Sequence, residues 1–176
     1  MKHTTFIVGL LLLPLVFSIT PAESQPSAIP VNVYARFDSF IVTRKVDPIG
    51  NRPAEAYGQF RVFGNWQSTS RIWAGVGQQY NPGWLLKEYI PAASMNRYLV
   101  SYIEIKDKDP GRDDRLLSGQ VNVSLQDCSY WYSADGGINR KNINPGNQRG
   151  NTCVVQVGLV GRKAETTVTL EIERLQ

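Results

Sequence analysis

Short runs in which apolar and polar residues alternate with a period of two recur along most of the chain. In the last run, Val168, Leu170 and Ile172 alternate with threonine and glutamate. Successive side chains of a β-strand point to opposite faces, so this alternation is typical of a half-buried strand. Nine such runs, separated by turn residues, predict an all-β fold, an antiparallel eight-stranded β-sandwich. The runs are 31–37, 40–46, 56–63, 71–76, 84–90, 97–105, 120–125, 154–160 and 166–173.

The N-terminus has the features of a secretory signal peptide. Lys2 and His3 precede an apolar run over 6–17, and small residues follow at Thr20 and Ala22. A helix of that length covers about 18 Å, less than the ~30 Å of a bilayer core, which favours a cleaved signal over a membrane anchor. We therefore expect a signal peptide at 1–22, a leader at 23–30 and one domain at 31–176, secreted or periplasmic, without a transmembrane segment.

Composition excludes several classes of function. The single histidine, His3, lies in the expected signal peptide, so His-dependent catalysis and His-ligated zinc are excluded. Neither a nucleophile elbow nor a phosphate-binding glycine loop is found in the sequence, and we predict that the protein is not an enzyme. A net charge of +4 is too small to indicate a nucleic-acid partner. We expect a monomer.

Cys128 and Cys153 are the only two cysteines. In an exported protein an even pair predicts a disulfide, and the alternative is two free buried thiols. The segment between them is rich in Gly, Asn and Ser, which predicts a long polar loop over 129–152. The loop begins with Tyr130, Trp131 and Tyr132, which either cap the core of the sandwich or form a stacking platform for a sugar or a partner protein.

An acidic turn between two runs is the strongest candidate for a site. Pro110-Gly111 reverses the chain between two pairs of aspartates, which brings the pairs towards each other. Crowded carboxylates repel, and Ca²⁺ bound by six to eight oxygens would neutralise them. The alternative is a solvated turn in which basic neighbours balance the acids. The aspartates are Asp107, Asp109, Asp113 and Asp114, and the basic neighbours are Lys106, Lys108 and Arg112.

Three motifs in register resemble those of the C2-domain family. Residues 105–109 followed by 114–119 resemble its third loop, where Asp-x-Asp ends a strand and another Asp precedes the next one. Asn81-Pro-Gly-Trp84 is similar to the family's Asn-Pro-x-Trp turn. Asp47, followed by Pro and Gly, stands where the family has its first loop. The segment between the two cysteines is an atypical insertion.

The resemblance implies a C2-like sandwich with Ca²⁺ held between loops at one end. Asp47 would supply the first-loop ligand, and Asp107, Asp109 and Asp114 the third-loop ligands, with Asp113 as a substitute. Lys108 and Arg112 would meet an anionic headgroup. The implied function is a secreted, non-enzymatic, lipid-binding or partner-binding module, calcium-dependent or calcium-stabilised, on an anionic membrane surface or an extracellular protein. The alternative is a secreted interaction or inhibitor domain that uses the aromatic loop 129–152 without calcium.

Overall fold

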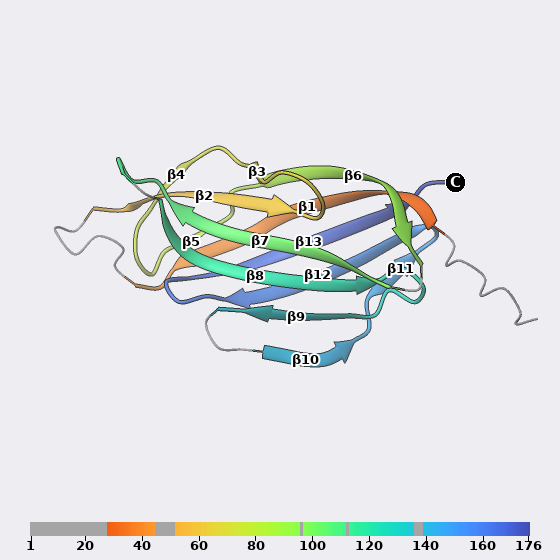
Figure 1. Cartoon of the computed structure of the whole chain (residues 1–176). Helices are drawn as coiled ribbons and strands as arrows, with labels where there is room; N and C mark the ends of the chain where they lie inside the picture. The colour runs from red at the N-terminus through yellow and green to blue at the C-terminus, as the bar shows by residue number, and fades with distance from the viewer. Residues whose placement is uncertain (1–27, 45–51, 96, 112, 136–138) are drawn as a thin grey trace, which may run out of the picture.

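In a computed structural model the chain forms two antiparallel β-sheets that pack face to face (Figure 1). The structure describes residues 28–44, 52–95, 97–111, 113–135 and 139–176, without the side chains of 139–141. The expected signal peptide, Asp47 and Arg112 lie outside these residues. Within them there is no helix, and so none that could span a bilayer.

The first sheet has the strand order β11-β12-β13-β1-β5, and β6 also pairs with β1. Its central strand β1 pairs along nearly its whole length with β13 on one side and with β6 on the other. The strands are β1 (Ala28–Val42), β5 (Gln79–Tyr80), β6 (Trp84–Ser94), β11 (Asn147–Arg149), β12 (Thr152–Val160) and β13 (Ala164–Arg174).

The second sheet has the strand order β10-β9-β8-β7-β2-β3, and β4 also pairs with β2. Its longest pairing joins β7 and β8 across the acidic turn. The strands are β2 (Ala54–Arg61), β3 (Gln67–Ser68), β4 (Ile72–Ala74), β7 (Tyr98–Asp107), β8 (Asp114–Ser124), β9 (Tyr130–Ala134) and β10 (Asn139–Asn144).

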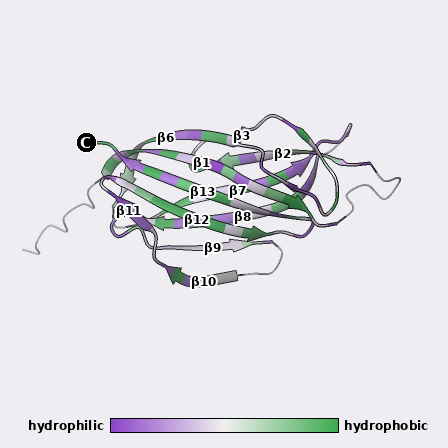
Figure 2. Cartoon of the chain, turned by 180° about the vertical axis from the view of Figure 1, so that it is seen from behind, coloured by the Kyte–Doolittle hydropathy of each residue, from purple (hydrophilic) through white to green (hydrophobic). Residues whose placement is uncertain are grey.

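Alternating side chains fill the space between the sheets, and Figure 2 shows hydrophobic and hydrophilic residues alternating along the strands. Val168, Leu170 and Ile172 of β13 are fully buried, as the period of two predicts. Phe40 lies between aromatic neighbours, 5.3 Å from Trp84 and 5.4 Å from Tyr80 between ring centroids. Burial of large aromatic rings supplies much of the hydrophobic stabilisation of such a core.

The prediction of an eight-stranded β-sandwich is confirmed. One four-stranded layer, β12-β13-β1-β6, lies in the first sheet and another, β8-β7-β2-β4, in the second, and the other described strands bring the sheets to six and seven strands. The bounds of several runs differ. The runs 31–37 and 40–46 belong to the single strand β1, which begins at Ala28 and ends at Val42, and β8 begins at Asp114, before the run 120–125. The register shifts between Phe37 and Ser39, so an extra residue at Asp38 restores the inward position of Phe40.

The expected long loop 129–152 contains regular structure. Its first half forms β9 and β10, which extend the second sheet beyond β8, and its second half contains β11, which pairs with β12 of the first sheet. Unpaired backbone groups at a sheet edge can pair with a polar strand as well as with an apolar one. Polar composition therefore identified an exposed segment but could not exclude strands.

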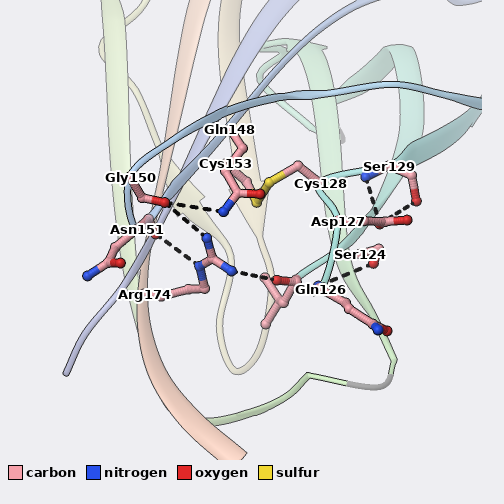
Figure 3. The surroundings of a disulfide bond; sticks show 11 residues. Ser124, Gln126, Asp127, Cys128, Ser129, Gln148, Gly150, Asn151, Cys153 and Arg174 are labelled. Carbon is pink, nitrogen blue, oxygen red and sulfur yellow. Dashed lines mark hydrogen bonds between the residues drawn. A yellow bond between two sulfur atoms is a disulfide. The ribbon is translucent and has the colours of Figure 1, made fainter.

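The predicted disulfide is confirmed at the base of this insertion. Cys128 follows β8 of the second sheet and Cys153 lies in β12 of the first, with 5.4 Å between their Cα atoms. Arg174 of β13 lies beside the bond (Figure 3). Its guanidinium donates to the carbonyl oxygens of Leu125, Gly150 and Asn151 at 3.0–3.2 Å. Covalent and hydrogen bonds thus hold both ends of the insertion against the sandwich.

Candidate functional site

The acidic turn joins β7 to β8 at one end of the sandwich (Figure 1). The backbone N–H of Lys108 donates to the carbonyl of Glu55 at 3.1 Å, which fixes the turn against the start of β2. The N–H of Lys163, in the β12–β13 hairpin, donates to the carbonyl of Leu116 at 2.9 Å. Elements of both sheets therefore surround the turn.

Asp107 is the buried member of the acidic group. Its side chain lies at the end of β7, only 6% of the residue is exposed, and its Oδ1 accepts the backbone N–H of Glu55 at 2.6 Å. Burial raises its pKa above the ordinary value, and the nearby carboxylates of Asp109, Asp114 and Glu55 raise it further. Asp107 is thus a carboxylate whose charge is opposed by its surroundings.

Asp113 has the opposite environment. Lys108 Nζ lies 2.8 Å from its Oδ1, and the hydroxyl of Tyr57 donates to its Oδ2 at 2.6 Å. Hydrogen bonds from Lys108 and then Tyr57 lower the pKa of Asp113 to about 2. Burial, together with the bond to Asp113, raises the pKa of Tyr57. Asp113 is therefore ionised and fully paired.

Basic residues also pair with the acids around Asp113. Lys163 Nζ lies 3.0 Å from Asp114 Oδ2, and Glu104 lies between Lys106 at 3.2 Å and Arg115 at 3.9 Å. An open depression of about 720 Å³ runs over these pairs. Its charged lining residues are Glu104, Lys106, Lys108, Asp113, Asp114, Arg115, Asp135 and Arg162. Charges of both signs thus cover this end of the molecule.

The structure tests the crowding of the four aspartates only in part. Asp113 and Asp114 each pair with a lysine, whereas Asp107 lies close enough to Asp109 and Asp114 for their charges to raise its pKa. The residues that the structure describes contain no group of three or more acidic, Cys or His side chains arranged to hold a metal ion. Because Asp47 lies outside them, the calcium ligand set stays a prediction.

Two partners of the acidic turn carry no local signal in the sequence. Tyr57 is 56 residues before Asp113, and Lys163 is 49 residues after Asp114. Each reaches the turn through strand pairing, since β2 lies beside β7 and the β12–β13 hairpin closes over β8. The side chain of Glu55, which stands near the first-loop motif, pairs instead with Arg71 at 2.8 Å.

The aromatic trio of the insertion divides between two faces, because β9 is a strand. Tyr130 and Tyr132 stack with 6.4 Å between ring centroids and pack against the hydrophobic core. Trp131 points the other way and meets Tyr98 edge to face at 6.5 Å. Two of the three rings therefore cap the core, and only Trp131 belongs to the outer surface of the second sheet.

We expect the pairing of Asp113 to make stability depend on acid pH. A carboxyl group with a lowered pKa in the folded state stabilises the fold above its unfolded pKa, and this contribution is lost as the pH falls through the folded value. From the ordinary value of 3.8 and the folded value of about 2, the stability difference between the wild type and Asp113→Asn should be constant above about pH 5 and should disappear between about pH 4 and pH 2. The raised pKa of Asp107 gives a pH dependence of stability with the opposite sign, but Asp107 is present in both proteins and its contribution cancels in the difference.

Urea unfolding at several pH values measures that difference, and the carboxyl chemical shift of Asp113 measures its pKa directly. Tyr57→Phe keeps Lys108 and should move the pKa only part of the way back to 3.8. An Asp113 that titrates near 3.8 in the wild type would show that these two contacts do not form in solution.

Comparison with known proteins bears on the fold. A scan against protein-family models and a search of curated proteins both find no match. Among solved structures, a C2 domain protein from Ramazzottius varieornatus is similar with a TM-score of 0.52 and 7% identity, over 85% of this chain and 92% of that one.

A human GIVD cytosolic phospholipase A2 in complex with an inhibitor and terbium chloride is also similar, with a TM-score of 0.52 and 13% identity. The match covers 85% of this chain but only 18% of the phospholipase chain. At sequence identities this low, structural similarity shows a shared fold and nothing about function. Together with the two four-stranded layers, these similarities show that the chain has a C2-like β-sandwich fold.

Proposed function

We propose that this protein is an exported, non-enzymatic binding module whose acidic end is stabilised by Ca²⁺ and docks on an anionic membrane surface or an extracellular partner. The observation that carries the proposal is the environment of Asp107. Its carboxylate is buried, and three neighbouring carboxylates oppose its charge. A bound divalent cation would relieve that repulsion, and Ca²⁺ prefers the oxygen ligands that carboxylates and carbonyls provide.

The donor set supports a cation beside Asp107 better than beside its neighbours. Among the residues described, the carboxylate of Asp107 receives one hydrogen bond, at Oδ1, which leaves Oδ2 available to a metal. Asp113 has both oxygens engaged by Lys108 and Tyr57. We therefore place Asp107, Asp109 and Asp114 among the calcium ligands together with Asp47, and regard Asp113 as an ion-pair partner of Lys108.

Basic residues beside the turn support an anionic surface as partner. Lys106, Lys108, Arg115 and Arg162 all line the depression. Carboxylates pair with Lys106, Lys108 and Arg115 in the absence of metal, so a bound cation would leave this end with a positive excess. Attraction to an anionic leaflet adds about 1 kcal/mol for each basic residue near the surface. Calcium and lipid would then bind in the same region and favour each other.

Thermal unfolding with added Ca²⁺ against added chelator tests the metal. At a hundred times the dissociation constant, binding adds about 2.7 kcal/mol, which raises the melting temperature of a domain this size by roughly 5–10 °C. Asp109→Asn should reduce the shift strongly, because the variant lacks one negative ligand. The substitution removes no hydrogen bond, since none of the described residues hydrogen-bonds to the carboxylate of Asp109. Asp127→Asn, which lies near the disulfide and bonds Ser129, should keep the full shift.

An unchanged melting temperature at millimolar Ca²⁺, or an equal shift in wild type and Asp109→Asn, would refute the calcium site. Sedimentation with phosphatidylserine–phosphatidylcholine vesicles tests the membrane arm separately. Binding should require Ca²⁺ and fall with salt, since it depends on charge. A calcium-induced melting shift without vesicle binding would favour an extracellular partner over a membrane.

A further inference from the structure

A second concave site lies on the outer face of the second sheet, across β7, β8 and β9. It is a shallow hollow of about 310 Å³ beside the charged depression. Leu117 and Val121 of β8 point into the core, so the residues between them on the strand, Ser118 and Gln120, point outward. The hollow is lined by Tyr102, Ser118, Gly119, Gln120, Ser133 and Asp135, with Ala134.

Strand register places these side chains in a row. Arg61 of β2 pairs with Tyr102 of β7, Tyr102 pairs with Gln120 of β8, and Gln120 pairs with Ser133 of β9. Side chains directly opposite each other on one face of an antiparallel sheet lie about 4.5–5.5 Å apart at Cβ. The row therefore presents an aromatic ring, an amide and a hydroxyl side by side.

The ring of Tyr102 is held in place from one side. The Arg61 guanidinium lies 5.1 Å from its centroid and 4.8 Å from that of Trp66, so the guanidinium is stacked between two rings. Arg61 comes from β2, on one side of β7. The residues that line the hollow together with Tyr102 come from β8, β9 and the residue that follows β9, on the other side of β7. The side of Tyr102 turned away from Arg61 thus borders the hollow as a preformed apolar wall.

The polar groups of the hollow are also fixed. The Gln120 amide donates to Asn122 Oδ1 at 2.9 Å, and Asn122 is only 2% exposed. The second polar atom of that buried side chain, Nδ2, has no partner among the described residues. Asn122 thus orients Gln120 through its Oδ1, at the cost of one unpaired buried donor.

Asp135 closes one end of the hollow. Its Oδ1 accepts the backbone N–H of Ser118 at 3.1 Å, and its Oδ2 lies 3.7 Å from Arg115 Nε. Asp135 is the only charged residue among those that line the hollow. Because Arg115 pairs with that carboxylate and no other charged residue lines the hollow, its lining carries little net charge, which favours a neutral ligand.

We infer that this hollow binds a neutral saccharide, one hexose unit of a glycan. A pyranose ring has an apolar face of C–H groups that can pack on Tyr102, and a rim of hydroxyls. An amide can donate to one hydroxyl and accept from the next, and a carboxylate can accept hydrogen bonds from adjacent hydroxyls. The volume lies at the lower end of the range for ligand sites, as a single sugar unit requires. Neither calcium nor the acidic turn contributes to this site.

Amide chemical shifts of the ¹⁵N-labelled protein test the inference with five neutral trisaccharides: cellotriose, maltotriose, mannotriose, chitotriose and β-1,4-galactotriose. At least one should give saturable shifts centred on 102, 118–120 and 133–135. Tyr102→Ala and Gln120→Ala should each weaken that binding at least tenfold. Tyr34→Ala is the matched control, because Tyr34 is a tyrosine of the other sheet that also meets a cation, Lys87. It should leave the affinity unchanged.

Tyr102→Phe keeps the ring and the fold and should retain most of the affinity, which separates loss of stacking from loss of structure. The titration is run with chelator present, so that its outcome does not depend on the calcium proposal. The inference is overturned if none of the five sugars gives saturable shifts at these residues at 10 mM, roughly the weak end of sugar affinity. Shifts that are equal in the wild type and Tyr102→Ala would overturn it as well.

Discussion

Replacing Phe40 by alanine should lower the free energy of unfolding by about 3–5 kcal/mol, the range for deletion of a buried phenylalanine ring. Phe40 is fully buried and stacks with both Trp84 and Tyr80, so the cavity would lie within a cluster of rings that cannot easily collapse. Chemical denaturation followed by tryptophan fluorescence measures the loss, because Trp84 is in direct contact.

Phe63→Ala is the matched control. Phe63 follows the end of β2 and is 74% exposed, so its removal should change stability by less than about 0.5 kcal/mol. If the two alanine variants lost similar amounts, the aromatic cluster around Phe40 would not be the centre of the core.

Removing the disulfide, in the double variant Cys128→Ala/Cys153→Ala, should cost about 3.5 kcal/mol. The bond closes a segment with a sequence separation of 25, and the chain-entropy relation for a loop of that length gives this value. Both cysteines are fully buried, and the bond joins the end of one sheet to a strand of the other. Guanidinium unfolding of the oxidised wild type and the double variant measures the difference.

The double variant should still fold, because the contacts of Arg174 with both ends of the insertion remain (Figure 3). Wild-type protein unfolded under reducing conditions provides the control and should approach the stability of the variant. A loss below about 1 kcal/mol would mean that the unfolded chain is already constrained there by other contacts.

Local alternation was sufficient to predict the sandwich, since the buried positions of β13 are those that the period of two assigns to the inner face. Features that depend on distant partners were not accessible. The bulge at Asp38 depends on pairing with β13, and the strand β9 depends on the free edge of β8. The local signals, a change of apolar phase at Asp38 and the aromatic start of β9, do not by themselves fix a bulge or a pairing.

In the candidate sites, too, local patterns were predictable from the sequence and contacts with distant residues were not. Spacing identified the acidic turn and its local partner Lys108, but the contacts of Tyr57 with Asp113 and of Lys163 with Asp114 depend on segments that the fold brings from elsewhere. The hollow on the second sheet depends on cross-strand rows, and its residues Tyr102, Gln120 and Ser133 come from three separate runs. A row of this kind is defined only when the register is known.

The insertion between the cysteines also protects the fold against self-association. Without it, the apolar strand β12 and the strand β8 would be the outermost strands on that side, with backbone groups free to template pairing between molecules. Instead, β9 pairs with 119–123 of β8 and β11 with 152–154 of β12. Over those stretches the outer borders are β11, which is three residues long, and β10, which is rich in asparagine with Arg140 and Lys141. Short, polar and charged borders disfavour the addition of a foreign strand, so this segment shortens the hydrophobic strand edge that is open to fibril growth.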